Sequence, residues 1–144
     1  MEILKRVIDI INKAIPDVPP ETGGIIGSSN GEIIDSVVID RPNVSYGKVC
    51  SYSPNVEFLN NSIATWQCNG IEFKGLFHTH FAGVDTLSCA DKRYITVIMN
   101  AMPETIKYLY FPVYILPDRR IKGYRAERAG ATIKITDEVV TVQD

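Results

Sequence analysis

The sequence predicts an α+β fold, in which helices pack on a mixed central sheet in an α/β/α-like arrangement. Three observations support this prediction. Apolar residues recur at helical spacing near the N-terminus, an Asn-Gly pair separates two apolar runs, and an alternating segment precedes another helical pattern. The chain has 144 residues, the size of one domain, so residues 1–144 are expected to fold as a single unit.

The N-terminal part is expected to form a helix followed by a hairpin. The apolar residues at helical spacing place the helix over residues 2–15, and the prolines at 16, 19 and 20 end it. Two apolar runs, 22–29 and 32–39, flank Asn30-Gly31, which is a strong hairpin signal. Residues 41–52 are rich in Pro, Asn, Ser and Gly and predict a loop, with a short strand as an alternative.

A second helix is expected to open at Ser53-Pro54, with Ser as N-cap and Pro at the first helical position, and to end at Asn69-Gly70. Its inward face would consist of Val56, Leu59, Ile63 and Trp66. Residues 71–80 then alternate as a strand. One side would carry Ile71, Phe73, Gly75 and Phe77, and the other Leu76, His78 and His80.

The remainder predicts one helix and several strands. After a loop at 81–87, Ser88 begins a helix that runs to about Ala101, with Tyr94, Ile95, Ile98 and Met99 inward. Residues 108–116 predict a strand in which Pro112 indicates an edge position or a bulge. Pro117-Asp118 turns into a strand at 120–126, and residues 131–142 predict a last hairpin.

Composition narrows the class of protein. The net charge is −2 and no basic run occurs, so neither a nucleic acid nor a membrane is expected as a partner. Three cysteines, Cys50, Cys68 and Cys89, are an odd number at uneven spacing. They indicate a reducing compartment, here the cytoplasm, and are expected to be small core residues.

The histidines carry the strongest chemical signal. The chain has only two, His78 and His80, and positions two apart in a strand point to the same face. Asp91 follows eleven residues later, and a strand–loop–helix can bring it over the end of that strand. Two imidazoles and one carboxylate leave one tetrahedral position open, as catalytic zinc requires. Glu21, near the start of the first hairpin strand, is the candidate to accept a proton from water activated by the metal.

Each of these residues also has an ordinary structural explanation when taken alone. A single His-x-His pair on a strand is usually incidental. Ser88 and Asp91 fit the start of a helix, as a cap and a favourable first-turn carboxylate. Glu21 would then be one more loop carboxylate, like Glu32 and Asp35 on the solvated side of the hairpin.

Together, these segments resemble the JAMM motif of the JAB/MPN family. That motif is a Glu, a distant His-Ser/Thr-His, seven residues, a Ser, two residues and an Asp. The chain contains Glu21-Thr-Gly-Gly-Ile-Ile-Gly, His78-Thr-His80, the seven residues Phe81 to Leu87, and Ser88-Cys-Ala-Asp91. The likeness covers roughly residues 20–100 and is nearest to the stand-alone prokaryotic type.

The resemblance implies an MPN/cytidine-deaminase-like fold and a zinc metallopeptidase or isopeptidase. His78, His80 and Asp91 would bind one zinc ion per chain, Glu21 would be the general acid/base, and Ser88 would donate its hydroxyl to the developing oxyanion. Two departures stand out: Phe81 replaces the Pro that many members have after the second His, and the chain has no room for the long insertions with which eukaryotic deubiquitinases hold ubiquitin.

The expected substrate is a protein or peptide with an extended C-terminal tail, such as a ubiquitin-like or sulfur-carrier-like protein, with a partner subunit as a further possibility. Two alternatives stay open. One is a non-catalytic MPN-like scaffold, although such members typically lose metal ligands. The other is a zinc hydrolase of a small-molecule amide; a deaminase would need His-x-Glu and Pro-Cys-x-x-Cys, and the chain has neither.

Overall fold

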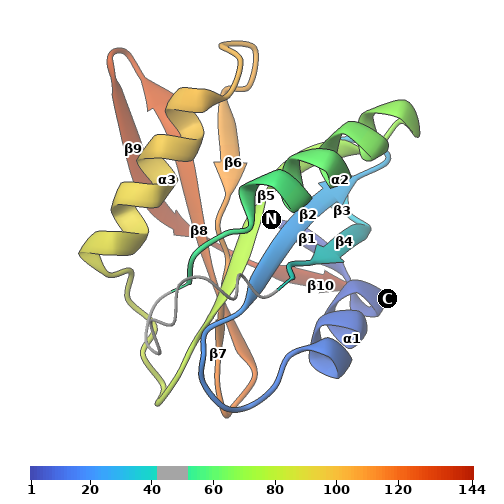
Figure 1. The fold of residues 1–144 in the computed structure, drawn as a ribbon, viewed down its shortest axis with the longest axis vertical. Coiled ribbons are helices and arrows are strands. Elements are labelled where there is room, and N and C mark those ends of the chain that lie inside the picture. Colours follow the sequence, from blue (N-terminus) through green and yellow to red (C-terminus); the bar gives the residue numbers. More distant parts are fainter. Residues whose placement is uncertain (42–51) are drawn as a thin grey trace.

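The computed structural model describes residues 1–41 and 52–144 (Figure 1). Within these ranges the helices are α1 (Lys5–Ala14), α2 (Val56–Cys68) and α3 (Cys89–Ala101). The strands are β1 (Glu2–Leu4), β2 (Gly23–Ser28), β3 (Ile33–Ile34), β4 (Ser36–Ile39), β5 (Glu72–His80), β6 (Tyr108–Tyr110), β7 (Val113–Ile115), β8 (Arg120–Ala129), β9 (Thr132–Glu138) and β10 (Thr141–Gln143). The expected loop at 41–52 falls almost wholly outside the described residues.

A mixed seven-stranded sheet forms the centre of the fold. Strand β2 lies between β4 and β5 and is antiparallel to both. Strands β6 and β7 follow β5 in parallel, each pairs antiparallel with β8, and β9 completes the sheet beside β8. The predicted α+β class with a mixed sheet is therefore confirmed.

Helices cover both faces of this sheet (Figure 1). Adjacent residues of β2 belong to different cores, because successive side chains of a strand point to opposite faces. The α2/α3 core contains Ile25, Leu59, Trp66, Leu76, Ile95 and Met99 among others. The α1 core contains Ile3, Val7, Ile11, Ile26, Phe77 and Tyr114 among others. Fully burying one such aliphatic side chain contributes about 1.5–3 kcal/mol, so both cores stabilise the sheet.

The alternation of β5 is interrupted, which corrects one prediction. Phe73 was expected on the same side as Phe77, but it packs with Leu76 in the α2/α3 core. The pairing with β2 shifts register here: Ile26 opposes Gly75, whereas Gly27 opposes Phe73. The extra residue in β5 moves the side chains that precede it to the opposite face of the sheet. Leu76, His78 and His80 follow the irregularity and stay on the predicted side. Gly75 has φ +143°, and a Cβ there would collide with the backbone of Tyr110.

The two ends of the chain meet in a second sheet that the sequence pattern does not reveal. The predicted helix over 2–15 begins only at Lys5, because Glu2–Leu4 forms β1 between β3 and β10. The predicted hairpin at 131–142 is also wrong as drawn. Strand β9 pairs with β8, and β10 pairs in parallel with β1. The pairing of β1 with β10 joins residues more than a hundred positions apart, and local periodicity does not reveal such a contact.

Two predicted strands are divided. The run 32–39 splits at Asp35 into β3, which joins the second sheet, and β4, which forms the expected hairpin with β2. The run 108–116 splits at Phe111-Pro112 into β6 and β7, and because it lies between β5 and β8, the irregularity is an interruption, not an edge. Strand β8 runs to Ala129, three residues beyond its predicted end.

Helix α2 starts later than expected. Asn55, not Ser53, is the N-cap, and its side chain accepts a hydrogen bond from the backbone N–H of Phe58. Val56 is consequently exposed, while Leu59 and Trp66 are buried.

Two of the cysteines are not core residues. Cys68 is the last residue of α2 and Cys89 is the first residue of α3, and both are exposed. Cys50 lies outside the described residues. In the part of the chain that the structure describes, no helix combines the length and apolar character needed to cross a membrane.

Candidate metal centre

Three buried side chains converge at the end of β5. The Nε2 atoms of His78 and His80 lie 2.9 Å apart. The carboxylate of Asp91 lies 3.1 Å from Nε2 of His80 through Oδ2 and 3.3 Å from Nε2 of His78 through Oδ1. The three residues are 0%, 5% and 6% exposed, respectively. The predicted ligand set is therefore brought together, with one nitrogen of each ring and both carboxylate oxygens facing a common point.

The ends of two elements produce this arrangement. His78 and His80 share a face of β5, as their spacing predicts. Asp91 lies in the first turn of α3, where it forms a capping box with Ser88. The Asp91 N–H donates to the Ser88 hydroxyl at 3.0 Å, and the Ser88 N–H donates to Asp91 Oδ2 at 2.9 Å. The capping box thus holds the carboxylate of Asp91 against the histidines. Asp91 can therefore cap the helix and also serve as a candidate metal ligand.

The outer nitrogens of both rings have partners of their own. Nδ1 of His80 lies 3.0 Å from the carbonyl oxygen of Val84 and therefore donates its proton there. Nδ1 of His78 lies 2.9 Å from the hydroxyl of Tyr94 on α3. These contacts assign the proton of His80 to Nδ1 and leave Nε2 free to act as a ligand, and partners of this kind orient metal-binding histidines.

The loop that supplies the Val84 carbonyl is itself anchored. The Gly83 N–H donates to the Leu116 carbonyl at 3.3 Å, and the Tyr124 hydroxyl donates to the Asp85 carbonyl. Ala82 and Gly83 have positive φ values of 56° and 71°, which turn the loop back toward β5.

The electrostatics of the cluster suit a cation. Burial lowers the pKa of His78. Burial also acts to lower the pKa of His80, but the hydrogen bond and charge of Asp91 outweigh it, so the pKa of His80 is raised. Burial acts to raise the pKa of Asp91, yet its hydrogen bonds with His78 and His80 hold that pKa well below its usual range. At neutral pH, Asp91 is thus a carboxylate and His78 a neutral imidazole.

The donor set fits a zinc-sized ion. A tetrahedral ion about 2.0–2.1 Å from each nitrogen separates two ligand atoms by roughly 3.3 Å. The observed separations of 2.9–3.3 Å are close to that edge length. Two imidazoles and one carboxylate are the ligands of a catalytic site that keeps one position open. The group could therefore bind a metal ion.

Metal affinity is expected to fall as the pH decreases through the raised pKa of His80, because a proton competes with the metal for Nε2 of this residue. The pKa of this residue is raised above its ordinary 6.5, so protonation begins near neutrality, whereas Asp91 stays ionised throughout. Below the His80 pKa, affinity should decrease about tenfold per pH unit. Titrations with Co²⁺ between pH 5.5 and 8 would measure this. An affinity independent of pH over that range would show that His80 is not a ligand.

Tyr94→Phe is expected to weaken metal binding about 10–100-fold, the usual effect of removing the partner of a ligand histidine. The ring of Tyr94 would remain in the core, so the fold should be retained. Tyr114→Phe is the matched control, because the buried Tyr114 hydroxyl finds no partner among the described residues. Equal Co²⁺ affinities of the two variants would contradict the role of Tyr94.

Glu21 lies just before β2, within electrostatic reach of the cluster. Gly23 opposes His78, and Thr22 is bonded to Thr79, so continuing the antiparallel register brings Glu21 opposite His80. Burial raises the pKa of Glu21 to about 7, with Asp91 acting in the same direction and His80 and the Tyr52 backbone N–H against it. A carboxyl group with this pKa can both accept and donate a proton at neutral pH.

The structure adds two residues that the sequence did not single out for chemistry. Tyr94 was expected only as an inward residue of α3; its spacing of three from Asp91 puts both on one helix face, which was the available signal. Tyr52 stacks on the ring of His78, with centroids 6.0 Å apart and an interplanar angle of 11°. No local pattern around Tyr52 indicated this contact.

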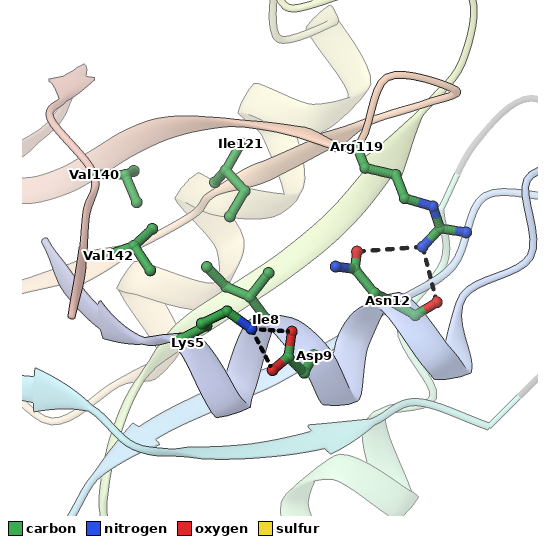
Figure 2. Close-up of a pocket in the computed structure, with 8 residues that line it drawn as sticks. All are labelled: Lys5, Ile8, Asp9, Asn12, Arg119, Ile121, Val140 and Val142. Atoms are coloured by element: carbon green, nitrogen blue, oxygen red, sulfur yellow. Dashed lines mark hydrogen bonds and ion pairs between the residues drawn. The ribbon is translucent and has the colours of Figure 1, made fainter. Parts of the chain in front are cut away.

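One surface hollow lies away from the metal cluster. Its volume is about 480 Å³, and it lies between α1, the turn before β8, and β10 (Figure 2). Its charged groups are already paired, Lys5 with Asp9 at 2.9 Å and Arg119 with Asp17 at 2.7 Å. Such a self-neutralised surface offers little to a charged ligand, so the hollow is not the candidate site.

Comparisons with known proteins place the fold. No protein-family model matches the chain, and no curated protein matches it. Among solved structures, a protein from Desulfitobacterium hafniense superposes with a TM-score of 0.70 at 17% identity, covering 100% of this chain and 94% of that one. A protein from Salinibacter ruber gives a TM-score of 0.56 at 14% identity, covering 100% and 92%.

A JAB1/MPN domain protein from Archaeoglobus fulgidus is also similar, with a TM-score of 0.52 at 18% identity over 99% of this chain and 97% of that one. At such identities the likeness concerns the fold alone. The fold is thus MPN-like, and a triad of two histidines and an aspartate that fits the JAMM pattern lies within it.

Proposed function

We propose that this protein is a zinc-dependent peptidase or isopeptidase that hydrolyses an amide bond at the C-terminal tail of a ubiquitin-like or sulfur-carrier-like protein. The observation that carries the proposal is the convergence of His78, His80 and Asp91 on one point, with Glu21 across the strand pair from His80. The MPN-like fold and the possible metal site point to a metal-dependent hydrolase. Zinc, the peptide bond and the identity of the substrate are the finer parts of the proposal.

His78, His80 and Asp91 would hold the metal. When bound there, zinc supplies Lewis-acid polarisation of a carbonyl group and acidifies water to a pKa of about 7. Glu21 then accepts the proton of the attacking water and delivers it to the leaving amine. Its pKa of about 7 matches both tasks, because the group is neither a strong acid nor a strong base at neutral pH.

Ser88 would assist at the substrate carbonyl. Its hydroxyl oxygen accepts the N–H of Asp91, and an oxygen that accepts one bond still has a proton to donate. The cap therefore orients the hydroxyl without consuming its donor. We propose that this proton is donated to the developing oxyanion, a stabilisation that grows as negative charge forms.

An extended tail suits the edge of the sheet. Among the strands that the structure describes, β4 stands at the end of the order, beside β2, and Ile39 opposes Gly24 there. The next residue of β2, Gly23, opposes His78 of β5. A peptide that paired with such an edge would bind through its backbone and place few demands on side chains, which favours a Gly-rich tail. A partner subunit could supply further grip on the folded part of the substrate.

We expect cleavage of β-grasp proteins whose flexible C-terminal tail is extended or conjugated, and only weak cleavage of folded ubiquitin chains. The physical reason is the short His80–Ser88 connection, seven residues long, which offers little surface for gripping a folded partner. The measurement is a panel assay with tail-extended β-grasp proteins, ubiquitin chains, unrelated peptides and small amides, each repeated with Glu21→Gln.

Metal analysis of the purified protein belongs to the same experiment and should find about one zinc per chain. Efficient Glu21-dependent hydrolysis of small amides, without cleavage of any protein tail, would replace the peptidase by a small-molecule hydrolase. A protein that binds no metal and cleaves no member of the panel would be a scaffold.

A further inference from the structure

Tyr52 contacts both halves of the proposed site. Its ring stacks on His78 and meets the ring of Tyr94 edge-on, with centroids 6.4 Å apart and an interplanar angle of 80°. Its backbone N–H also lies near enough to the Glu21 carboxyl group to act to lower the pKa of that group. A single residue is therefore next to one metal-ligand candidate on β5 and to the general-base candidate that precedes β2.

The strand beneath Tyr52 is shaped to admit its ring. A Cβ on Gly23 would lie 2.7 Å from Cζ of Tyr52 and would also collide with the carbonyl oxygen of Phe77. Glycine at this position thus lets the ring lie over β2 and reach His78. The ring of His78 therefore contacts two tyrosines, Tyr52 on its face and Tyr94, whose hydroxyl lies 2.9 Å from Nδ1.

The far end of Tyr52 is tied to a carboxylate. Its hydroxyl donates to Oδ2 of Asp40 at 2.6 Å, and the same oxygen accepts the N–H of Asn55, the N-cap of α2, at 3.0 Å. Asp40 is in turn fixed to β2, since its N–H donates to the carbonyl of Gly23 at 2.8 Å. The tether therefore connects the end of β4, Tyr52 and the start of α2, and none of its bonds involves a residue of the metal cluster.

We propose that Tyr52 is a positioning residue, held by Asp40, that keeps the His78 ring and the Glu21 carboxyl group in a fixed relation to each other. This inference rests on the proposed function, because it assigns Tyr52 a purpose only if His78 binds a metal and Glu21 moves a proton. The ring acts on His78, and the tether acts on Glu21 through the backbone of Tyr52. The two contributions can be removed separately.

Tyr52→Leu removes the ring and should lower the affinity for Co²⁺ about 10–100-fold, with a changed visible spectrum of the Co²⁺-loaded protein. Tyr52→Phe restores the ring and should restore the spectrum and most of the affinity. Tyr52→Phe lacks the hydroxyl that binds Asp40, so its turnover should remain about tenfold below the wild-type value, while KM stays near the wild-type value. Tyr114→Phe serves as the control for loss of a buried hydroxyl elsewhere.

Asp40 offers a matched pair of variants. Asp40→Asn keeps an oxygen that can accept both bonds and should retain turnover, whereas Asp40→Ala should lower it as Tyr52→Phe does. Melting of the metal-free variants identifies any loss of folding. A purely structural role would lower the melting temperature of Tyr52→Leu and leave its Co²⁺ affinity and spectrum unchanged, which would overturn the inference while the proposed function stands. Failure of the wild-type protein to bind Co²⁺ would instead overturn the proposed function, and the inference with it.

Discussion

Glu21→Gln should leave the metal in place and lower turnover by at least the ~10²–10⁴-fold typical of a positioned general base. Gln is nearly isosteric with Glu, but its amide cannot take up the proton of water. The residue is only partly buried, so the fold should tolerate the change. The measurement is steady-state turnover on any substrate that the wild type cleaves, together with the zinc content.

Glu32→Gln is the matched control, since Glu32 is an exposed carboxylate of the same hairpin. Its turnover should equal that of the wild type. Near-normal turnover of Glu21→Gln would contradict the proposed mechanism.

Ser88→Ala is expected to lower turnover less than Glu21→Gln does, by roughly 10²–10³-fold, as for the loss of one oxyanion donor. It also removes the cap of α3 and should cost about 1 kcal/mol of stability.

The second large effect is expected from the ligand candidates. His78→Ala or Asp91→Ala should abolish metal retention, because either change leaves two protein ligands where a catalytic zinc site needs three. Asp91→Asn tests the role of the Asp91 carboxylate in metal binding with a smaller change of structure. Its amide oxygen can still accept the Ser88 N–H, so the capping box is kept while the negative charge is lost. Metal content after gel filtration and Co²⁺ affinity are the measurements.

Asp85→Asn is the control for these variants, as Asp85 is an exposed carboxylate of the connecting loop. It should bind metal as the wild type does. If His78→Ala and Asp91→Ala both keep zinc as tightly as the wild type, the ligand assignment is wrong. Metal-free melting of each variant distinguishes loss of a ligand from loss of the fold.

The sequence predicted the candidate site better than it predicted the element boundaries. His78 and His80 lie two apart in a strand, and Ser88 caps the helix that carries Asp91, so every step of that prediction is local. The capping box that the spacing of Ser88 and Asp91 suggests is present at the start of α3. Whether Glu21, Ser88 and the triad perform their proposed roles stays a prediction until the variants are measured.

The predicted boundaries of helices and strands are wrong where pairing with a distant segment competes with the local conformational preference. Glu2–Leu4 continues a helical pattern, yet it is drawn into a sheet by Ile33–Ile34 and Thr141–Gln143. The bulge in β5 follows from its pairing with β2 and reverses the side on which Phe73 lies. Backbone hydrogen bonds and burial supplied from elsewhere in the chain outweigh propensities of a few tenths of a kcal/mol per residue.

The sequence by itself determined which side chains are able to bind a metal, because their chemistry and their spacing within one strand and one helical turn are local properties. Only the tertiary structure decided what holds them in place. Tyr94 reaches His78 across the strand–helix interface, and Tyr52 reaches it from beyond β4, anchored on Asp40. These contacts depend on where three separate elements pack, and packing is settled by the whole core and leaves no periodic trace in the residues that make the contacts.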